Sequence, residues 1–343
     1  MDITRQRLRT QRLTGRGFAA PEDAVRWFGA VQAQDYPGAL WALGLRTEGA
    51  TEASVKQAIA DRRIVRSWPL RGTLHFTTPA DLRWMLKWCA PQTLARVGAR
   101  FRQFGLDEPI FSRSAKVIVK ALEGGRQLTR PQIYTHLERV KIATRGNRGS
   151  HIIFRLASEG LICFAGYADK QPTMALLDEW LPASPVLDRD EAFAELARRY
   201  YGSHAPATLQ DFTWWSGLKA GDAKRATEAA GIELGRTHVS RKAASRTSPH
   251  VLMLPCYDEY TVAYRDRSAA LDPKHASATR NGIFHPIIVI DGRVAGTWAR
   301  RIDRDGLAVT LKPVARPTAA QSRAIAAAAA RYGRFLGLPV RIL

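Results

Sequence analysis

Two glutamines that stand two residues apart, Gln32 and Gln34, have the types and the spacing to carry out chemistry together. They lie in the stretch AVQAQDYPG, residues 30–38. A neutral amide cannot accept a proton at a useful pH, so neither glutamine is a general base. Its carbonyl oxygen can instead hold a water molecule and direct a dipole at a positive charge that develops during a reaction. The alternative interpretation is that both are solvated side chains at the end of a helix.

The elements around the glutamines decide whether the two amides can meet. An apolar periodicity over 21–32 predicts a helix, and Pro21 suits its first position. Pro37 disfavours helical backbone at Tyr36, so this helix should end within a few residues of Gln34. Residues two apart point to different sides of a helix but to the same side of an extended chain. The two amides therefore converge only if the chain leaves the helix around them.

The net charge of the chain indicates a polyanionic partner. The 343 residues include 52 Lys and Arg against 31 Asp and Glu, which gives a net charge of +21. Nucleic acid is the first candidate for such a partner, and an anionic membrane surface is the second. With 45% hydrophobic residues the chain can build cores, and it is long enough for two or three domains.

Several classes of protein are excluded by what the sequence lacks. The sequence contains no run of about 18 apolar residues, the length that could span a bilayer. The first residues lack the apolar core of a signal peptide, so we expect a cytoplasmic protein. Cys89, Cys163 and Cys256 are far apart and never in a C-x-x-C spacing, which favours reduced thiols over disulfides or a metal site. We expect no cofactor and no metal.

An order of helices followed by a β-hairpin recurs along the chain. The first instance comprises predicted helices over 4–12, 21–32, 38–46 and 51–62 and strands over 64–68 and 73–77. This order is typical of a winged-helix domain. A second instance covers 114–176, and a third begins with a helix over 190–201 and includes the hairpin signature Asp291-Gly292. We therefore predict a mainly helical α+β fold of three tandem winged-helix units in a C-shaped arrangement. The predicted units are residues 1–100, 101–185 and 186–343, the last of them β-rich.

Four stretches of the sequence carry a resemblance to a known family. They are 31–34 (VQAQ), 70–75 (LRGTLH), 254–268 (beginning LPCYDEY) and 281–298 (beginning NGIF and ending GTW). In this order they resemble the AlkZ/YcaQ-like bacterial DNA glycosylases, winged-helix proteins that remove bulky alkylated bases and unhook interstrand crosslinks. The resemblance implies that Gln32 and Gln34 are catalytic and belong to the Gln-x-Gln subclass, which is associated with self-protection against natural-product alkylators. Asp35 lies one place beyond the aspartate of the other subclass and does not correspond to it.

The chemistry that the resemblance implies agrees with these residue types. Guanine alkylated at N7 carries a positive charge that weakens its glycosidic bond, so the base leaves without a general acid. Two amides that position one water would then suffice for a monofunctional glycosylase. A base tethered to an intercalated molecule or to the opposite strand is not easily flipped into a pocket. We therefore expect no deep base pocket near Gln32 and Gln34.

Seven other side chains are candidates for contacts with DNA. They are Arg66, Arg71 and His75 in or beside the first predicted hairpin, Arg145, Arg148 and His151 at the start of a helix in the second unit, and Arg293 after a hairpin tip. For the first hairpin and for Arg293, a solvated edge or turn is the alternative. Arg265 and Arg267 are expected instead to pair with Asp258 or Asp266 inside the fold.

Two hypotheses of different class follow. The first is a DNA glycosylase that acts on double-stranded DNA carrying bulky N7-alkylguanines and interstrand crosslinks. The second is a non-catalytic winged-helix regulator or architectural protein that binds duplex DNA. A monomer in the nucleoid is expected for the first, because three units in one chain already give an extended footprint, whereas regulators usually pair two half-sites. A membrane-surface role comes last, because no basic amphipathic helix with a lipid-ready face stands out.

Overall fold

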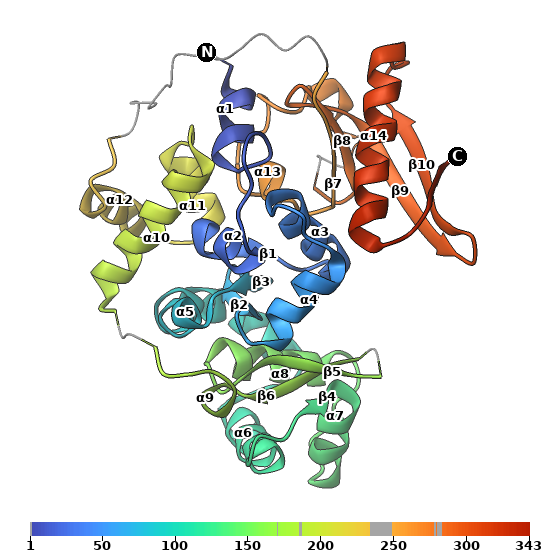
Figure 1. Cartoon of the computed structure of the whole chain (residues 1–343). Coiled ribbons are helices and arrows are strands. Elements are labelled where there is room, and N and C mark those ends of the chain that lie inside the picture. Colours follow the sequence, from blue (N-terminus) through green and yellow to red (C-terminus); the bar gives the residue numbers. More distant parts are fainter. Residues whose placement is uncertain (1, 170, 185–186, 234–248, 278, 280–282) are drawn as a thin grey trace.

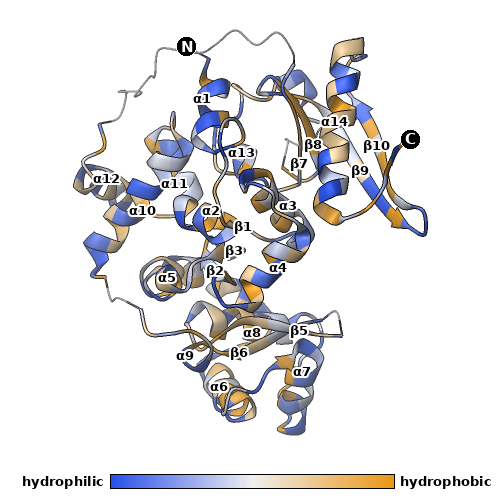
Figure 2. Ribbon diagram, in the orientation of Figure 1, coloured by the Kyte–Doolittle hydropathy of each residue, from blue (hydrophilic) through white to orange (hydrophobic). Residues whose placement is uncertain are grey.

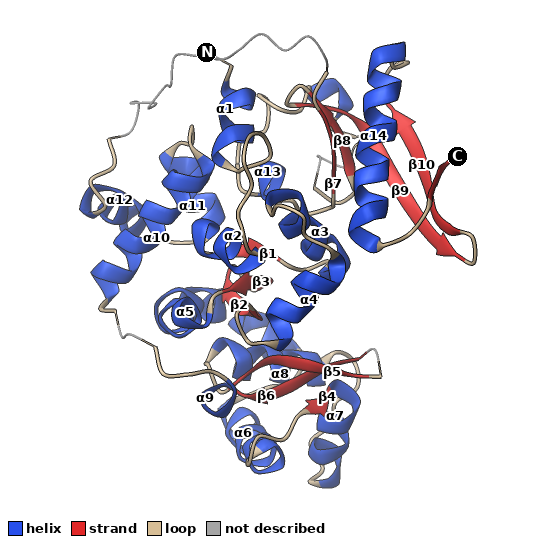
Figure 3. Ribbon diagram, in the orientation of Figure 1, coloured by secondary structure: helices blue, strands red, loops and turns tan. Residues whose placement is uncertain are grey.

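The computed structural model describes residues 2–169, 171–184, 187–233, 249–277, 279 and 283–343. Over these residues the chain is an α+β protein in which helices pack against three separate sheets (Figures 1 and 3). In this described part, no helix combines the length and the apolar character that crossing a membrane requires. The predicted boundary at residues 185–186 and residues 281–282 of the fourth resemblance stretch lie outside the described residues.

The first part of the chain places three short strands among helices. Its elements are α1 (Ile3–Thr10), α2 (Pro21–Phe28), β1 (Val31–Gln32), α3 (Tyr36–Arg46), α4 (Glu52–Ala60), β2 (Val65–Leu70) and β3 (Thr73–Thr77). The strands form an antiparallel sheet in the order β1-β3-β2, so β3 is its central strand. The predicted hairpin of β2 and β3 is confirmed, and its turn has left-handed backbone at Arg71 (φ 56°) and Gly72 (φ 76°).

The middle part repeats the order of helices and strands. Its elements are α5 (Pro79–Gln103), α6 (Glu108–Leu122), β4 (Leu128–Thr129), α7 (Arg130–Arg139), α8 (Arg148–Ser158), β5 (Ile162–Ala168), β6 (Gln171–Leu176) and α9 (Leu177–Trp180). The strands form a sheet in the order β4-β6-β5. Thr129 and Gln132 form the capping box that their spacing predicts, which explains why α7 begins where it does.

The last part consists of a helical segment and a curled sheet. Its elements are α10 (Arg189–His204), α11 (Leu209–Ser216), α12 (Ala220–Ala229), β7 (Val251–Leu254), α13 (Glu259–Val262), the 3-10 helix η1 (Pro273–His275), β8 (Ile287–Ile290), β9 (Arg293–Asp303), β10 (Gly306–Pro313), α14 (Ala319–Leu336) and β11 (Val340–Ile342). The five strands are ordered β11-β10-β9-β8-β7. The predicted two-residue turn between β8 and β9 is confirmed, with positive φ at Asp291 (49°) and Gly292 (87°).

The largest hydrophobic core joins the two ends of the chain. It contains residues from α1 to β3 together with residues of the C-terminal sheet and α14. Trp41 of α3 lies against Tyr332 of α14, with ring centroids 4.8 Å apart, and donates its Nε1–H to the Met253 carbonyl (2.7 Å). A separate core packs α5 against α10, α11 and α12. The predicted third unit thus contributes to two cores, and Figure 2 shows its strands β7 and β8 as largely apolar.

A buried ion pair fixes the segment after β7 against the first part of the chain. Arg46, at the end of α3, donates two hydrogen bonds to the Asp258 carboxylate (2.9 and 2.8 Å), and both side chains are buried. The expectation that Asp258 pairs with Arg265 or Arg267 is therefore wrong. Arg267 instead donates to the Thr261 carbonyl (2.9 Å). Because the pair is bidentate and shielded from water, it holds the neighbouring residue Glu259 in a defined place.

Candidate active site

The strand β1 determines where Gln32 lies. Helix α2 ends at Phe28, because Gly29 takes up left-handed backbone (φ 77°), and not at Gln32 as the periodicity predicts. The chain then pairs with β3, with Gln32 opposite His75, and the Ala33 N–H donates to the Leu74 carbonyl (2.7 Å). The chain therefore leaves the helix before Gln32. This is the condition under which two amides spaced two residues apart can converge.

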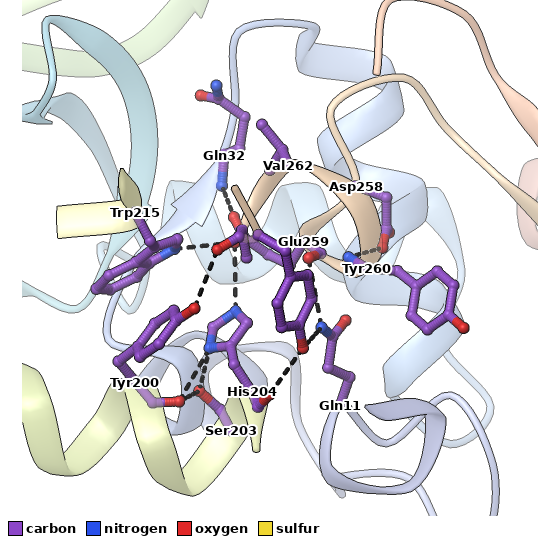
Figure 4. Close-up of polar contacts among 12 residues, drawn as sticks. Gln11, Gln32, Tyr200, Ser203, His204, Trp215, Asp258, Glu259, Tyr260 and Val262 are labelled. Atoms are coloured by element: carbon purple, nitrogen blue, oxygen red, sulfur yellow. Dashed lines mark hydrogen bonds and ion pairs between the residues drawn. The ribbon is translucent and has the colours of Figure 1, made fainter. Parts of the chain in front are cut away.

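The side chain of Gln32 is nearly buried and its carbonyl oxygen is not engaged. Gln32 is 6% exposed, and its Oε1 accepts no hydrogen bond from any residue in the described part of the chain. Its backbone N–H donates to Glu259 Oε1 (2.7 Å), and Figure 4 shows the amide group pointing away from that carboxylate. A shielded acceptor without a protein donor is suited to hold a water molecule or to face a cation.

Gln34 is placed differently from Gln32. It is exposed, and its Oε1 accepts a hydrogen bond from the Leu74 N–H (3.2 Å) near the start of β3. An amide oxygen has two lone pairs, so Gln34 keeps one acceptor position and both N–H donors for a substrate or a water. The two glutamines therefore differ in their hydrogen bonds. Gln32 offers an oxygen that accepts none from the described residues, whereas the oxygen of Gln34 accepts one from β3 and so fixes its own loop to the sheet.

The carboxylate of Glu259 is the anchor of the Gln32 backbone. It is buried and lies 2.7 Å from the Gln32 N, 3.0 Å from Trp215 Nε1 and 3.4 Å from His204 Nε2 (Figure 4). Burial alone would raise the pKa of Glu259, but His204 and the Gln32 N–H outweigh burial and lower that pKa. Glu259 is therefore ionised at neutral pH, and its charge is held in place by N–H donors from β1 and α11.

Aromatic rings hold the partners of Glu259 in turn. His204 stacks on Tyr200, with ring centroids 4.6 Å apart and an interplanar angle of 17°. Its Nδ1 lies 2.8 Å from Ser203 Oγ and 3.2 Å from the Tyr200 carbonyl oxygen. The ring of Trp215 lies 5.0 Å from that of Tyr200. Because these groups are buried and close-packed, a change in any of them would be transmitted to the Gln32 peptide.

Arg66 supports the loop between the glutamines, although the sequence suggests it as a DNA contact. Its Nε and Nη2 donate to the Ala33 carbonyl (3.1 and 2.7 Å), and Nη2 also reaches the Gln34 carbonyl (3.5 Å). The guanidinium lies 5.3 Å from the centre of the Tyr36 ring. Burial lowers the pKa of Arg66, but an arginine remains charged at neutral pH. Arg66 therefore holds the backbone of Ala33 in place, and any contact with phosphate comes in addition.

His75 cannot contact phosphate in this arrangement, so that prediction is wrong. It lies on the central strand β3 and is fully buried, because β1 covers the edge that a two-stranded wing would leave open. Burial and the positive charge of Arg71 lower the pKa of His75 to about 3, so the ring is neutral at physiological pH. Arg71 is half-buried and donates to the Trp215 carbonyl, so its main contact is also within the protein.

The other predicted contacts lie at opposite ends of the molecule. Arg145 is exposed before α8, whereas Arg148 donates to the Phe104 and Ala143 carbonyls. The ring of His151 lies 4.7 Å from that of Phe104, and burial lowers the pKa of His151. Arg293 is exposed at the β8–β9 turn, far from α8 (Figure 1). Arg145 and Arg293 thus stay predictions as DNA contacts, and Arg148 and His151 are mainly held within the fold.

Sequence reasoning missed Glu259, His204 and Trp215. Glu259 lies within a stretch that carries the family resemblance, but it has no partner nearby in the sequence. One signal was available: Asp258-Glu259 stands between apolar and aromatic residues in a strongly basic chain, and a carboxylate in such a place needs buried donors.

The structure contains a cavity of about 440 Å³ between the end of α3 and α14. Neither Gln32 nor Gln34 lines this cavity, so it is not part of the candidate active site.

The comparisons with known proteins identify the family of the chain. A family model described as DNA glycosylase AlkZ-like matches residues 25–335, which include both glutamines and Glu259. The protein is therefore a DNA glycosylase, and the hypothesis of a non-catalytic regulator is wrong. The chain belongs to the AlkZ-like DNA glycosylase family.

Two findings come from one organism, Streptomyces sahachiroi. A protein described as an interstrand DNA cross-link repair glycosylase is 26% identical over an alignment of 370 positions, which covers 98% of this chain and 97% of that protein. The solved structure of DNA glycosylase AlkZ is similar with a TM-score of 0.77 and 24% sequence identity, over 100% of this chain and 98% of that one. The structural likeness confirms the α+β fold over the full length.

Proposed function

We propose that this enzyme is a monofunctional glycosylase for bulky N7-alkylguanines, including those that form interstrand crosslinks, and that Gln32 and Gln34 position the attacking water. The single observation that carries this proposal is the oxygen of Gln32. It is shielded from solvent, it receives no hydrogen bond from the described residues, and its backbone is fixed by a buried carboxylate. An amide oriented in this way presents its dipole without needing to reorganise during the reaction.

The proposed reaction needs no protein acid. The C1′–N9 bond breaks, and its electron pair neutralises the positive charge of the alkylated imidazole ring. The sugar becomes an oxocarbenium ion, which the carbonyl dipoles of Gln32 and Gln34 stabilise. The positioned water adds to C1′, and because an amide cannot accept its proton, the proton passes to solvent. The products are the free alkylated base and an abasic site.

Several finer features belong to the same proposal. The helix-and-hairpin order of the first two parts supports winged-helix units, with boundaries near residues 100 and 185, in a C-shaped arrangement around duplex DNA. The relative from Streptomyces sahachiroi is described as a cross-link repair enzyme, which supports crosslinked substrates here. We also propose that the protein acts as a monomer in the nucleoid, without cofactor or metal, and that it protects its host from a DNA-alkylating natural product.

The lesion preference tests the proposal most directly. Purified enzyme is incubated, in the presence of a metal chelator, with duplexes that carry one N7-alkylguanine, one uracil or one 8-oxoguanine. Mild alkali then cleaves the strand at abasic sites. We expect cleavage only with the N7-alkylguanine, because a site made of amides cannot assist a neutral leaving group. Release of uracil, or activity that depends on added metal, would contradict an amide-only site.

The affinity for DNA should depend steeply on salt. The net charge of +21 favours many contacts with phosphates, each of which releases counterions on binding. For about six contacts, raising the salt from 50 to 200 mM is expected to weaken binding by roughly a thousandfold. Fluorescence anisotropy with an unmodified duplex measures this, and a second duplex of unrelated sequence should give the same slope. An affinity unchanged by salt would argue against a mainly electrostatic interface.

A further inference from the structure

An exposed tyrosine lies beside residues 32–36, the segment that carries Gln32 and Gln34 and is called the catalytic loop below. Tyr167, near the end of β5, is 46% exposed. Its ring centroid lies 5.3 Å from that of Tyr36, and the two rings are tilted by 45° to one another. Tyr36 stands two residues after Gln34 and also packs edge-on against Phe76 of β3 (6.0 Å). Tyr36 thus supports Tyr167 from within the protein, while about half of Tyr167 remains accessible.

Arg66 connects this aromatic pair to the glutamines. Its guanidinium donates to the Ala33 and Gln34 carbonyls and lies 5.3 Å from the Tyr36 ring and 5.0 Å from the Phe164 ring. Phe164 belongs to the same strand as Tyr167, so one cation bridges the catalytic loop and the β5–β6 hairpin. The placement of Tyr167 relative to Gln34 is therefore fixed by packing from both sides.

The surroundings of Tyr167 are those of a nucleic-acid contact. Positive charges from Arg66 and Lys56 act on its hydroxyl. Burying an aromatic ring is favourable when its role is packing alone, yet 46% of Tyr167 remains exposed. Exposed aromatic rings beside positive charges are how proteins stack on the bases of nucleic acids.

We propose that Tyr167, supported by Tyr36, stacks on a flat aromatic ring of the substrate next to the bond that Gln32 and Gln34 attack. The ring is either a nucleobase at the lesion or the aromatic body of the adduct. This inference rests on the proposed function, since it identifies the class of lesion that the same site prefers. It makes Tyr167 a residue that determines specificity, separate from the amides that position water.

Two variants of Tyr167 and two lesions test this inference. Tyr167→Ala removes the ring, and Tyr167→Phe keeps the ring but removes the hydroxyl. Ile3→Ala serves as control, because Ile3 is equally exposed (45%) but lies on α1. Each protein is given one duplex with N7-methylguanine and one with a polycyclic aromatic N7-guanine adduct. Dissociation constants and single-turnover rates of base release are measured, and thermal melting confirms that each variant is folded.

We expect Tyr167→Ala to weaken binding of the aromatic adduct roughly 5- to 100-fold, the range for losing one stacked ring. Tyr167→Phe and Ile3→Ala should bind like the wild type. A loss confined to the aromatic adduct identifies the adduct body as the stacked ring, and an equal loss for both lesions identifies a nucleobase. Wild-type binding by Tyr167→Ala overturns the inference, as does an equal loss in Tyr167→Phe.

The outcome can be separated from failure of the proposed function. If the wild type releases neither base, the proposed function fails. The dissociation constants for the same two duplexes still show whether the ring of Tyr167 contacts the lesion. If the wild type releases both bases and Tyr167→Ala behaves like it in every measurement, only the stacking inference fails.

Discussion

Replacing Gln32 by alanine is expected to lower the rate of base release about 100- to 1000-fold, the effect of removing one positioned electrostatic partner. The affinity for adducted duplex should stay unchanged, because the side chain is nearly buried and its oxygen serves the reaction rather than the backbone of DNA. Single-turnover rates at saturating enzyme, together with anisotropy, separate the two quantities. Gln57→Ala is the matched control, since Gln57 is an exposed glutamine on α4.

Variants of Gln34 test whether the two glutamines act together on one water. Gln34→Ala should also slow release, and because it removes the bond to the Leu74 N–H, it should lower the free energy of unfolding by about 1 kcal/mol. The double variant should lose less than the product of the single losses, because both amides act on one water. Gln34→Asp restores the pattern of the other subclass and should keep activity on bulky adducts. Wild-type rates in both alanine variants would show that these glutamines are only solvated side chains.

Replacing Glu259 by glutamine is expected to have the second large effect. The carboxylate is buried, and an amide N–H in its place would oppose the N–H of Gln32 or that of Trp215. Leaving buried hydrogen-bonding groups without their partner costs about 1–3 kcal/mol, so urea unfolding should show a loss of at least this size. Base release, measured where the variant is still folded, should also slow down, because the Gln32 peptide loses its anchor. Glu228→Gln, at an exposed glutamate of α12, is the control.

Two further measurements separate positioning from stability alone. Since Glu259 acts through Gln32, adding Gln32→Ala to Glu259→Gln should cost much less activity than it does in the wild type. The pKa of Glu259 is lowered in the folded state, so its contribution to stability is present above the unfolded value of 4.5 and is lost as the pH falls through the folded value. Glu259→Gln should therefore show a weaker loss of stability in acid. Full additivity with Gln32→Ala would contradict a positioning role.

Local patterns in the sequence predict most of the helices, strands and turns, because neighbouring residues determine where these elements begin and end. The Asp291-Gly292 turn, the capping box of α7 and the hairpin of β2 and β3 each depend on residues a few places apart, and each is confirmed. The end of α2 is the exception. Gly29 is a residue that helix ends favour, but Val31 continues the apolar period beyond it, and a two-residue strand has no pattern of its own.

The parts of the site that could not be predicted depend on contacts between distant segments. His75 was expected at the surface because a hairpin was visible, but the two-residue strand β1 is too short to be recognised by its pattern. Its pairing makes β3 central and buries the histidine. Glu259 and Gln32 are separated by 227 positions, so only the fold shows that one anchors the other. The Gln-x-Gln spacing predicts the chemistry, whereas the contact that holds the Gln32 backbone depends on the tertiary structure.

The bond from the Gln32 N–H to Glu259 also has a consequence for the synthesis of the protein. A ribosome that has made the first 250 residues has already produced both glutamines, His204 and Trp215, but not the carboxylate that they need. The strands β8 to β10, which complete the largest core, come later still. Contacts of such long sequence separation form late and slowly. We therefore expect a chain truncated before Glu259 to carry the Gln-x-Gln pattern without the support of the proposed active site, and to release no base from DNA.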